Sequence, residues 1–373
     1  MTPLRVLHLA ANRWWTGSAD PTLRLVTGLR ARGHRVLLGL TPGDRFEAKA
    51  RDAGVEPVAG LQLSSRRTPL GIVQDIARLR RLVREEAIEV IHAHHSHDHW
   101  LSAAARAWRP EGRATPVIVR TFHNLRAVRS GALAAALYHR TTAVVAVSRE
   151  IEARCRALGF SSRRVSWTPG VADLARFDGS ADAGTIREEL KLGEAPVVVC
   201  VARLAPNRGQ ELLLSGFRRL LETLPGARLL LVGKGEARPR LEGAVAELGL
   251  SQSVVFAGYR DHDLPAVLAA ADCFALMAAG SDESCRAALE AMAARRPVVA
   301  RRVGALPDTV VDGETGVLLD QDTPEAVASA LLAVLADRAR ARAMGQAGRR
   351  RAEHEFNPER AVDIVERLYL SLR

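Results

Sequence analysis

Short apolar segments that alternate with helix-like segments are the feature that most constrains the fold of this chain. These segments are rich in β-branched residues and apolar on both faces, as strands are when helices cover both sides of a parallel sheet. The segments between them carry Leu, Val and Ala at helical spacing. Alternating strands and helices predict a doubly wound α/β fold. The predicted strands are residues 6–9, 35–40, 90–94, 117–122, 143–147, 197–201, 229–232, 254–257, 273–277 and 298–300, with helices over segments such as 19–32 and 209–223.

The number of predicted strands exceeds what one doubly wound sheet holds, so the sequence predicts two domains. A chain of 373 residues also fits two domains of ordinary size. The boundary is expected near residues 170–180, where Gly, Pro, Asp and Ala replace periodic apolar residues. We therefore expect a Rossmann-like N-terminal domain over residues 1–173, a C-terminal domain over 174–356 and one amphipathic helix over 357–373.

The net charge of +11 is unevenly distributed along the chain. Residues 1–173 hold 27 Lys and Arg against 14 Asp and Glu, whereas residues 174–373 hold 26 against 28. An arginine-rich genome would affect both halves alike, so we expect an anionic partner for the first half. A nucleic acid is disfavoured because the basic residues are scattered, only 4% of residues are aromatic and no recognition motif is present.

The sequence predicts no targeting or membrane-spanning segment. Its first residues, MTPLRVLHLAANR, lack the layout of a signal peptide, and no apolar stretch reaches about 18 residues. The four cysteines form no C-x-x-C pair, which disfavours a zinc or redox motif and fits a reducing compartment. We expect a cytoplasmic protein.

Polar residues directly after the predicted strands are the candidate ligand-binding residues, because ligands bind beyond the carboxyl ends of strands in open α/β sheets. Arg203 and Arg208 flank a turn that opens a helix. Two guanidinium groups at a helix N-terminus suit a phosphate, and two surface arginines are the alternative. Gly233 and Gly235 follow the next strand, where glycine allows either close backbone approach to a ligand or a tight turn.

Two acidic residues and one histidine are further candidates for contacts with a sugar. Glu290, within a predicted helix, could accept two hydrogen bonds from vicinal hydroxyls such as those of ribose, and Asp282 could reach a sugar hydroxyl. A helix cap for Asp282 and a solvated charge for Glu290 are the alternatives. His123 could donate to a sugar or phosphate oxygen, or be a hydrogen-bonded structural histidine.

Histidines crowd the segment HAHHSHDH, which raises the question of a metal site. Alternation along a strand puts His92 and His94 on one face, while His95 and the following residues enter a loop. No cysteine or carboxylate pattern completes a ligand set, so no metal site is predicted. Asp261 and Asp263 match an Asp-x-Asp metal-nucleotide pattern, but Asp263 fits a helix cap better.

Most of the candidate residues lie in a series of sequence segments whose order along the chain is itself informative. The second half contains VARLAPNRG, LLLVGKGEARPRLE, VVFAGYRDHDLPAVLAAADCFALMA, DESCRAALEAMAARRPVVARRVGALPD and VDGETGVLL; the first half contains RVLHLA, GLRARGHRV, EVIHAHH, TFHN and AVVAVSRE. Together they resemble the retaining family 4 glycosyltransferases of the GT-B fold, over nearly the whole chain. The resemblance implies two Rossmann-like domains facing a cleft, a C-terminal helix that crosses back to the N-terminal domain, and metal-independent transfer from a UDP- or GDP-sugar with retention of configuration.

The resemblance also implies roles for individual residues. Arg203 and Arg208 would contact the diphosphate, with Arg208 in place of the family's lysine. Glu290 would hold the nucleotide ribose, Asp282 would orient a hydroxyl of the donor sugar, and His123 would lie beside that sugar. Further donor contacts would come from Gly17, Gly233, Gly235, Glu283, Ser284, Gly304 and Asp308.

Several positions depart from the family's pattern. Asp282 is one methylene shorter than the usual Glu, and Glu283 and Ser284 stand in the family's glycine-rich stretch. Gly17 alone remains of the N-terminal Gly-Gly loop, and the interdomain segment reads PGVAD. A sugar-nucleotide epimerase, an inverting transferase and a nucleotide-sugar-binding protein with weak or no transfer are therefore alternatives. A nicotinamide-dependent reductase is disfavoured because the first strand lacks G-x-G-x-x-G.

The basic first half is the expected acceptor side. An anionic glycan or lipid-linked glycan, as in polysaccharide or lipopolysaccharide biosynthesis, would suit it, with peripheral docking on the inner face of the membrane. Trp14 and Trp15, beside Gly17, could stack on a sugar, enter the membrane interface or pack the loop. The nucleotide base, the sugar and the acceptor do not follow from the sequence.

Overall fold

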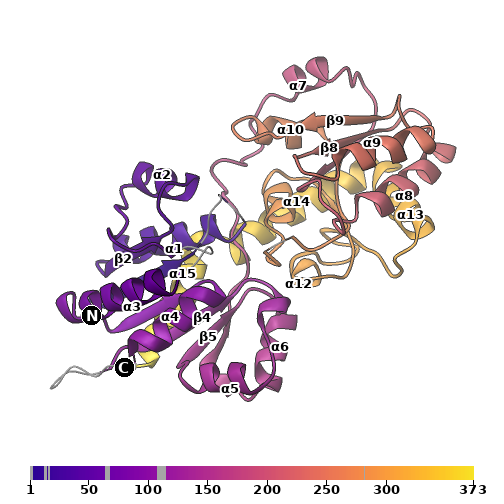
Figure 1. Ribbon diagram of the computed structural model, residues 1–373. Coiled ribbons are helices and arrows are strands. Elements are labelled where there is room, and N and C mark those ends of the chain that lie inside the picture. Colours follow the sequence, from indigo (N-terminus) through magenta and orange to yellow (C-terminus); the bar gives the residue numbers. More distant parts are fainter. Residues whose placement is uncertain (1–2, 12–14, 16, 64–67, 107–114, 281) are drawn as a thin grey trace. The chain divides into compact units, whose positions relative to one another are not determined.

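The computed structural model describes residues 3–11, 15, 17–63, 68–106, 115–280 and 282–373. The chain divides into two compact units, each built around a six-stranded parallel sheet with flanking helices (Figure 1). Unit 1 comprises residues 1–169, 281–283 and 358–373; unit 2 comprises residues 170–280 and 284–357. The doubly wound α/β class predicted from the sequence is confirmed.

Unit 1 contains a sheet with the strand order β2-β1-β3-β4-β5-β6, in which the paired strands run parallel. The order reverses between β1 and β3, the kind of position at which doubly wound folds bind ligands. Its elements are β1 Arg5–Ala10, α1 Ala19–Ala31, β2 Arg35–Leu40, α2 Arg45–Asp52, α3 Pro69–Glu85, β3 Val90–Ala93, α4 Ser96–Arg106, β4 Val117–Phe122, η1 Leu125–Ala127, α5 Ala132–His139, β5 Ala143–Ala146, α6 Arg149–Ala157, η2 Ser162–Arg164, β6 Val165–Trp167 and α15 Pro358–Ser371.

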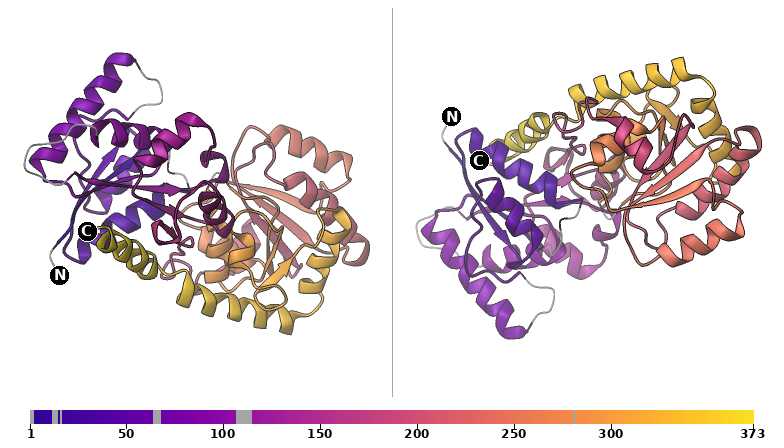
Figure 2. Two further views of the ribbon diagram at one scale, coloured as in Figure 1. Left: turned by 90° about the horizontal axis from the view of Figure 1, so that it is seen from below. Right: turned by 90° about the horizontal axis from the view of Figure 1, so that it is seen from above.

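The C-terminal helix α15 is part of the core of unit 1. It lies along α1 (Figure 2), and Val362, Val365 and Tyr369 are buried in the same cluster as the apolar residues of β1 and α1. Gly28 of α1 gives Val362 room, since a Cβ at Gly28 would lie 2.5 Å from a methyl carbon of Val362. The predicted return of the last helix to the N-terminal domain is confirmed.

Unit 2 has the strand order β12-β11-β10-β7-β8-β9. Numbered from its own first strand, this is the 3-2-1-4-5-6 order of the Rossmann fold, with the reversal between β7 and β10. Its elements are α7 Ala183–Glu189, β7 Val197–Val201, α8 Gln210–Thr223, β8 Arg228–Val232, α9 Arg238–Glu247, β9 Val254–Gly258, α10 Leu264–Ala270, β10 Cys273–Leu276, α11 Arg286–Ala293, β11 Val298–Ala300, α12 Leu306–Thr309, β12 Gly316–Leu318, α13 Pro324–Leu335 and α14 Arg338–Glu355.

Apolar strands explain why both sheets are covered on two sides. All five residues of β7 are Val or Cys, and their side chains divide between two clusters, one on each face of the sheet.

No helix in the part of the chain that the structure describes is long and apolar enough to span a bilayer.

Candidate active-site residues in the two units

Four histidines of unit 1 form a line where the order of the strands reverses. His8 on β1 lies opposite His92 on β3, His94 directly follows β3, and His123 directly follows β4. All four side chains are buried. Nδ1 of His8 lies 3.0 Å from Nε2 of His94, and Nδ1 of His94 lies 3.3 Å from Nε2 of His123. Nδ1 of His123 is 2.8 Å from a carboxylate oxygen of Asp282, which ends the line.

Tyr369 of α15 connects His92 to this line. Its hydroxyl lies 2.5 Å from Nδ1 of His92 and 3.3 Å from Nε2 of His8. Nε2 of His92 lies 2.6 Å from the hydroxyl of Thr121. Burial lowers the pKa of His8 to about 3 and the pKa values of His92 and His94 well below their usual range. These three imidazoles are therefore neutral near pH 7, and each has one donor and one acceptor nitrogen.

One bond of known direction fixes the tautomer of His94. The hydroxyl of Thr22 donates to the backbone oxygen of Ser18 at 2.8 Å. Since its proton is used there, this hydroxyl accepts from Nδ1 of His94 at 3.1 Å. Nδ1 of His94 therefore carries the proton, and Nε2 of His94 accepts from Nδ1 of His8.

The remaining directions follow from that tautomer. Nε2 of His8 must accept, so the hydroxyl of Tyr369 donates to it and accepts from Nδ1 of His92. The proton on Nδ1 of His94 also faces Nε2 of His123, while Nδ1 of His123 donates to Asp282. The donors thus point in one direction, from β3 and α15 towards Asp282, and such a chain holds each ring in one orientation.

His8, His92 and His94 also raise the question of a metal, because they offer nitrogen atoms within 4.8 Å of one another. Their rings, however, are stacked or tilted at centroid separations of 4.5 to 5.3 Å. Ring nitrogens present their lone pairs in the ring plane, so stacked rings do not direct them at one point. Both nitrogens of each ring already have hydrogen-bond partners. The geometry fits a hydrogen-bond network better than a set of metal ligands.

The segment before α11 is held by the loop that follows β4. The backbone N–H of Glu283 donates to the backbone oxygen of His123 at 2.8 Å, and the carboxylate of Glu283 accepts from the backbone of Leu125 at 2.9 Å. Burial raises the pKa of Glu283. Gly17 lies against Asp282, since a Cβ at Gly17 would approach the Cβ of Asp282 to 2.9 Å.

The interpretation of Asp282 as a helix cap is wrong. Helix α11 begins at Arg286, its N-cap residue is Cys285, and Asp282 pairs with His123 instead. The solvated alternative for Glu290 is also wrong, because Glu290 is 7% exposed and its carboxylate lies 3.2 Å from Nε of Arg286.

In unit 2, Arg203 and Arg208 lie in the loop between β7 and α8. Nη2 of Arg203 donates to Glu236 at 2.9 Å, and Nη1 of Arg208 donates to the backbone oxygen of Ala279, after β10, at 2.9 Å. Arg208 therefore joins the loops of the two strands between which the order of this sheet reverses. Gly209, with φ of 76°, is the N-cap of α8 and provides no side-chain cap to the first turn. Arginines beside such a helix N-terminus suit an anion.

Gly233 and Gly235 pack the loop after β8 against the loop after β7. A Cβ at Gly233 would lie 2.0 Å from the backbone oxygen of Ala202, and one at Gly235 would lie 2.0 Å from that of Leu204. This packing requires glycine at both positions without any ligand. The two glycines support the loop that carries Arg203.

The other predicted donor contacts lie at separate places in unit 2. Gly304, with φ of 57°, is in the loop after β11, and Asp308 is on α12, where its backbone oxygen accepts from Arg351 at 3.0 Å. Ser284 is buried, and a Cβ at Gly170 would lie 2.8 Å from its Cβ.

Two further predictions, on Asp263 and on Trp15, have mixed outcomes. Asp263 is the N-cap residue of α10, but its side chain makes no cap and pairs with Arg260 at 2.8 Å. Trp15 packs edge-on against Phe46, as the loop-packing alternative expects, with ring centroids 5.7 Å apart. Trp14 lies outside the described residues.

Sequence reasoning missed His8, Thr22, Arg120 and Tyr369 as parts of the polar interior of unit 1. One signal was available for His8: it occupies the middle of an apolar run, as His92 does in another predicted strand. The contribution of Tyr369 had no such signal, because it depends on contacts between residues 277 positions apart.

Comparison with known proteins identifies the family. The family model described as "Glycosyl transferases group 1" matches residues 182–351, and the one described as "Glycosyltransferase Family 4" matches residues 16–176. A GDP-mannose-dependent alpha-(1-6)-phosphatidylinositol monomannoside mannosyltransferase of Mycobacterium tuberculosis is 33% identical over 82% of this chain and 81% of that protein. A D-inositol 3-phosphate glycosyltransferase of Nocardia farcinica is 33% identical over 69% of this chain and 61% of that protein.

The same fold occurs in solved structures. HepE of Anabaena, in complex with UDP and glucose, matches with a TM-score of 0.84 at 19% identity, covering 99% of this chain and 100% of that chain. The matching family models and the named relatives together show a glycosyltransferase that uses a nucleotide sugar. The chain belongs to glycosyltransferase family 4.

Proposed function

We propose that this enzyme transfers mannose from GDP-mannose to a phosphoinositol-containing acceptor, with retention of configuration and without a metal ion. The donor and the acceptor class are supported by the names of two groups of relatives, which are GDP-mannose-dependent or act on inositol phosphates. The observation that carries the proposal is the pair Arg203 and Arg208 beside the uncapped N-terminus of α8.

These cationic groups suit the charge that develops on the leaving nucleotide diphosphate. As the bond between the anomeric carbon and the diphosphate oxygen breaks, negative charge grows on that oxygen. Arg203, Arg208 and the N–H groups of the first turn of α8 would stabilise it where it forms. Fixed cations of this kind do what a divalent ion would otherwise do.

Retention would follow from attack on the face that the leaving group departs. The acceptor hydroxyl oxygen bonds to the anomeric carbon, and its proton passes to the departing diphosphate oxygen, which balances the step. His123 and Asp282, fixed by their 2.8 Å hydrogen bond, would orient the donor sugar. Glu290 would accept from the ribose hydroxyls.

The acceptor and the membrane would meet the basic first half of the chain. Residues 1–173 hold 27 basic against 14 acidic residues, and this positive excess suits an anionic lipid headgroup and peripheral docking on the inner face of a membrane.

The proposal is tested by incubating the protein with GDP-mannose or a UDP-sugar, each with and without phosphatidylinositol or myo-inositol 1-phosphate, in EDTA. We expect an α-linked mannoside by NMR only with GDP-mannose and acceptor together. An inverted product, or activity that needs added Mg²⁺, would contradict retention or metal independence. An epimerised sugar nucleotide formed without acceptor would favour the epimerase alternative.

A further inference from the structure

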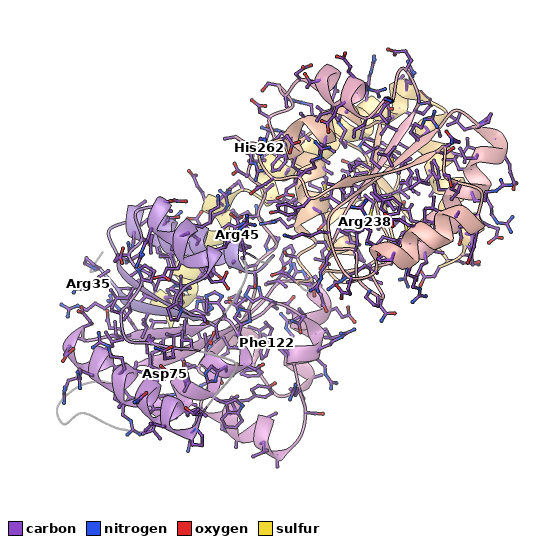
Figure 3. All side chains as sticks on the ribbon, turned by 45° about the horizontal axis from the view of Figure 1, so that its top comes forward. Arg35, Arg45, Asp75, Phe122, Arg238 and His262 are labelled. Atoms are coloured by element: carbon purple, nitrogen blue, oxygen red, sulfur yellow. The ribbon has the colours of Figure 1, made fainter. Side chains whose placement is uncertain are left out.

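A pocket of about 210 Å³ lies in unit 1, beyond the carboxyl ends of β3 and β4. Figure 3 labels Phe122, the last residue of β4, which immediately precedes the pocket residue His123. The described side chains that line the pocket are basic or neutral, with no acidic one among them: His94, His95, Ser96, Arg120, His123, Asn124, Arg126, Ala127 and Arg129.

Arg120 is the unusual member of this set. It comes from the strand itself, its side chain is 2% exposed, and its Nε has no hydrogen-bond partner among the described residues. Its Nη1 reaches the backbone oxygen of Ala93 at 3.3 Å. Burial lowers the pKa of Arg120 to about 10, so it still carries its charge at pH 7. A buried guanidinium with so few acceptors is costly unless an anion joins it.

The interior of unit 1 offers Arg120 only a weak counter-charge. Asp98 is buried nearby, but its oxygens accept from the backbone N–H groups of Ala11 and His95 at 3.0 to 3.2 Å. Burial raises the pKa of Asp98 to about 7, so this carboxyl is only partly ionised at neutral pH. The positive charge of Arg120 is therefore not fully compensated from within.

A second buried polar atom without a partner points to the same ligand. Nε2 of His95, another lining residue, is also buried without a partner among the described residues. Arg126 and Arg129 are exposed. An oxyanion with several acceptor oxygens would satisfy the guanidinium and the imidazole together and would be attracted by the two outer arginines.

We propose that this pocket binds the phosphate of the acceptor, a phosphate ester of a polyol, with Arg120 as the principal ligand and His95, Arg126 and Arg129 around it. This inference rests on the proposed function and names the part of the acceptor that unit 1 recognises. Because His123 lines the same pocket, a phosphate on Arg120 places the attached polyol next to the residue assigned to the donor sugar. The phosphate of a lipid headgroup and that of a soluble sugar alcohol share this chemistry.

The first test is calorimetric binding of myo-inositol 1-phosphate, with myo-inositol and inorganic phosphate as further probes. Saturating GDP is present throughout, so that the nucleotide site is filled. We expect saturable binding of myo-inositol 1-phosphate, weaker binding of inorganic phosphate and none of myo-inositol. Equal binding of the inositol with and without phosphate, or loss of binding when GDP is added, would overturn the proposal.

The second test compares variants under the same conditions. Arg120→Met should weaken the binding of myo-inositol 1-phosphate by roughly tenfold to a hundredfold, the effect of losing charged hydrogen bonds. It should not lower the Tm without ligand, because it removes an under-paired buried charge. A lower Tm together with unchanged affinity would assign Arg120 a structural role instead.

If Arg120→Met does not fold, variants of exposed arginines still test the proposal. The double variant Arg126→Gln/Arg129→Gln should weaken binding of the same probe at least threefold, and the control Arg163→Gln, an exposed arginine of η2, should not. Equal effects of the double variant and the control would overturn the proposal.

A final experiment distinguishes a lipid phosphate from a soluble one. It also distinguishes failure of the phosphate pocket from failure of the glycosyltransferase function. Vesicles containing phosphatidylinositol are compared with myo-inositol 1-phosphate as acceptors for transfer from GDP-mannose. A preference for either one identifies the source, provided that Arg120→Met raises the KM for that acceptor. Transfer to a neutral polyol with an unchanged KM in Arg120→Met would refute the phosphate pocket and leave the glycosyltransferase function intact.

Discussion

Unit 1 and unit 2 have the same kind of sheet but bury different side chains in it. The strands of unit 1 carry His8, His92 and Arg120 in their interior, and nine of the eleven histidines of the chain precede residue 174. The strands of unit 2 are almost entirely apolar, and its charged candidates Arg203 and Arg208 stand on a loop. Desolvated groups in unit 1 are held in fixed tautomers, whereas loop arginines in unit 2 remain accessible to an anion.

The largest expected consequence is a difference in acid stability. The pKa values of His8, His92, His94, His95 and His99 are lowered by burial, so the folded state binds fewer protons than the unfolded state below about pH 6.5. Stability is therefore lost as the pH falls from about 6.5, by about 2 kcal/mol for each such histidine at about pH 5. The raised pKa of Asp98 works in the opposite direction for one group.

We expect unit 1 to unfold at a higher pH than unit 2 on acidification. The two histidines of unit 2, His262 and His354, are exposed and give it no comparable effect. Hydrogen exchange followed by mass spectrometry at pH 7, 6 and 5 would measure this, with peptides of β1 and β3 losing protection before peptides of β7 and β8. Simultaneous loss in both units would show that the buried histidines do not govern acid stability.

The next effect concerns the accessible arginines of unit 2. Arg203→Ala should lower kcat by about a hundredfold or more, by analogy with the loss of a donor to a developing oxyanion, which costs about 3 kcal/mol. The side chain is 65% exposed, so the variant should keep the Tm of the parent protein. Arg238→Ala, which removes an exposed arginine of α9 paired with Glu242, is the matched control (Figure 3). Comparable activity in the two variants would remove Arg203 from the mechanism.

A smaller effect is expected for Glu290, the one buried acidic candidate of unit 2. Glu290→Gln keeps the shape of the side chain but weakens its acceptance of ribose hydroxyls, so GDP binding should weaken by about tenfold. The preference for GDP over 2′-deoxy-GDP should shrink in this variant. If both nucleotides lose the same factor, Glu290 supports α11 through Arg286 rather than contacting ribose.

Much of the fold could be predicted from the sequence, because a buried parallel strand consists of a short run of consecutive apolar residues. Each of the ten predicted strands overlaps an observed strand, and four of them, such as 117–122 and 197–201, have the observed bounds. The two strands that were missed, β6 Val165–Trp167 and β12 Gly316–Leu318, have three residues each and lie at the edges of their sheets. Such short edge strands are defined by a neighbour rather than by their own pattern.

The site was less predictable than the fold, because most of its contacts join residues far apart in the sequence. The loop after β7 follows its strand directly, so Arg203 and Arg208 could be identified from local sequence. The partners of His123 could not, because they come from positions 94 and 282. Asp282 and Glu283 were expected in the C-terminal domain but cluster with unit 1, an arrangement that depends on tertiary hydrogen bonds such as that of Glu283.

The smallest effect tests whether the buried chain of unit 1 has a positioning role or only fills space. Tyr369→Phe keeps the ring but removes the donor to Nε2 of His8 and the acceptor for Nδ1 of His92. Without that donor the tautomer of His8 is no longer fixed, and the constraint on His94 and thus on His123 is relaxed. We expect kcat to fall threefold to tenfold, about the value of one neutral hydrogen bond, with the KM for the donor unchanged.

Tyr138→Phe is the matched control, because the hydroxyl of Tyr138 accepts from the backbone of Arg129 outside the histidine chain. Long-range ¹H–¹⁵N NMR of histidine-labelled protein gives the second measurement. In the parent protein, His8, His92 and His94 should all carry the proton on Nδ1, opposite to the Nε2–H tautomer that a free neutral imidazole favours in water. In Tyr369→Phe the His8 resonances should show a tautomer mixture, while Tyr138→Phe leaves them unchanged. Parent resonances with the proton on Nε2 would reverse the direction of the chain, remove its link to Asp282 and leave the buried histidines of unit 1 without the positioning role inferred for them.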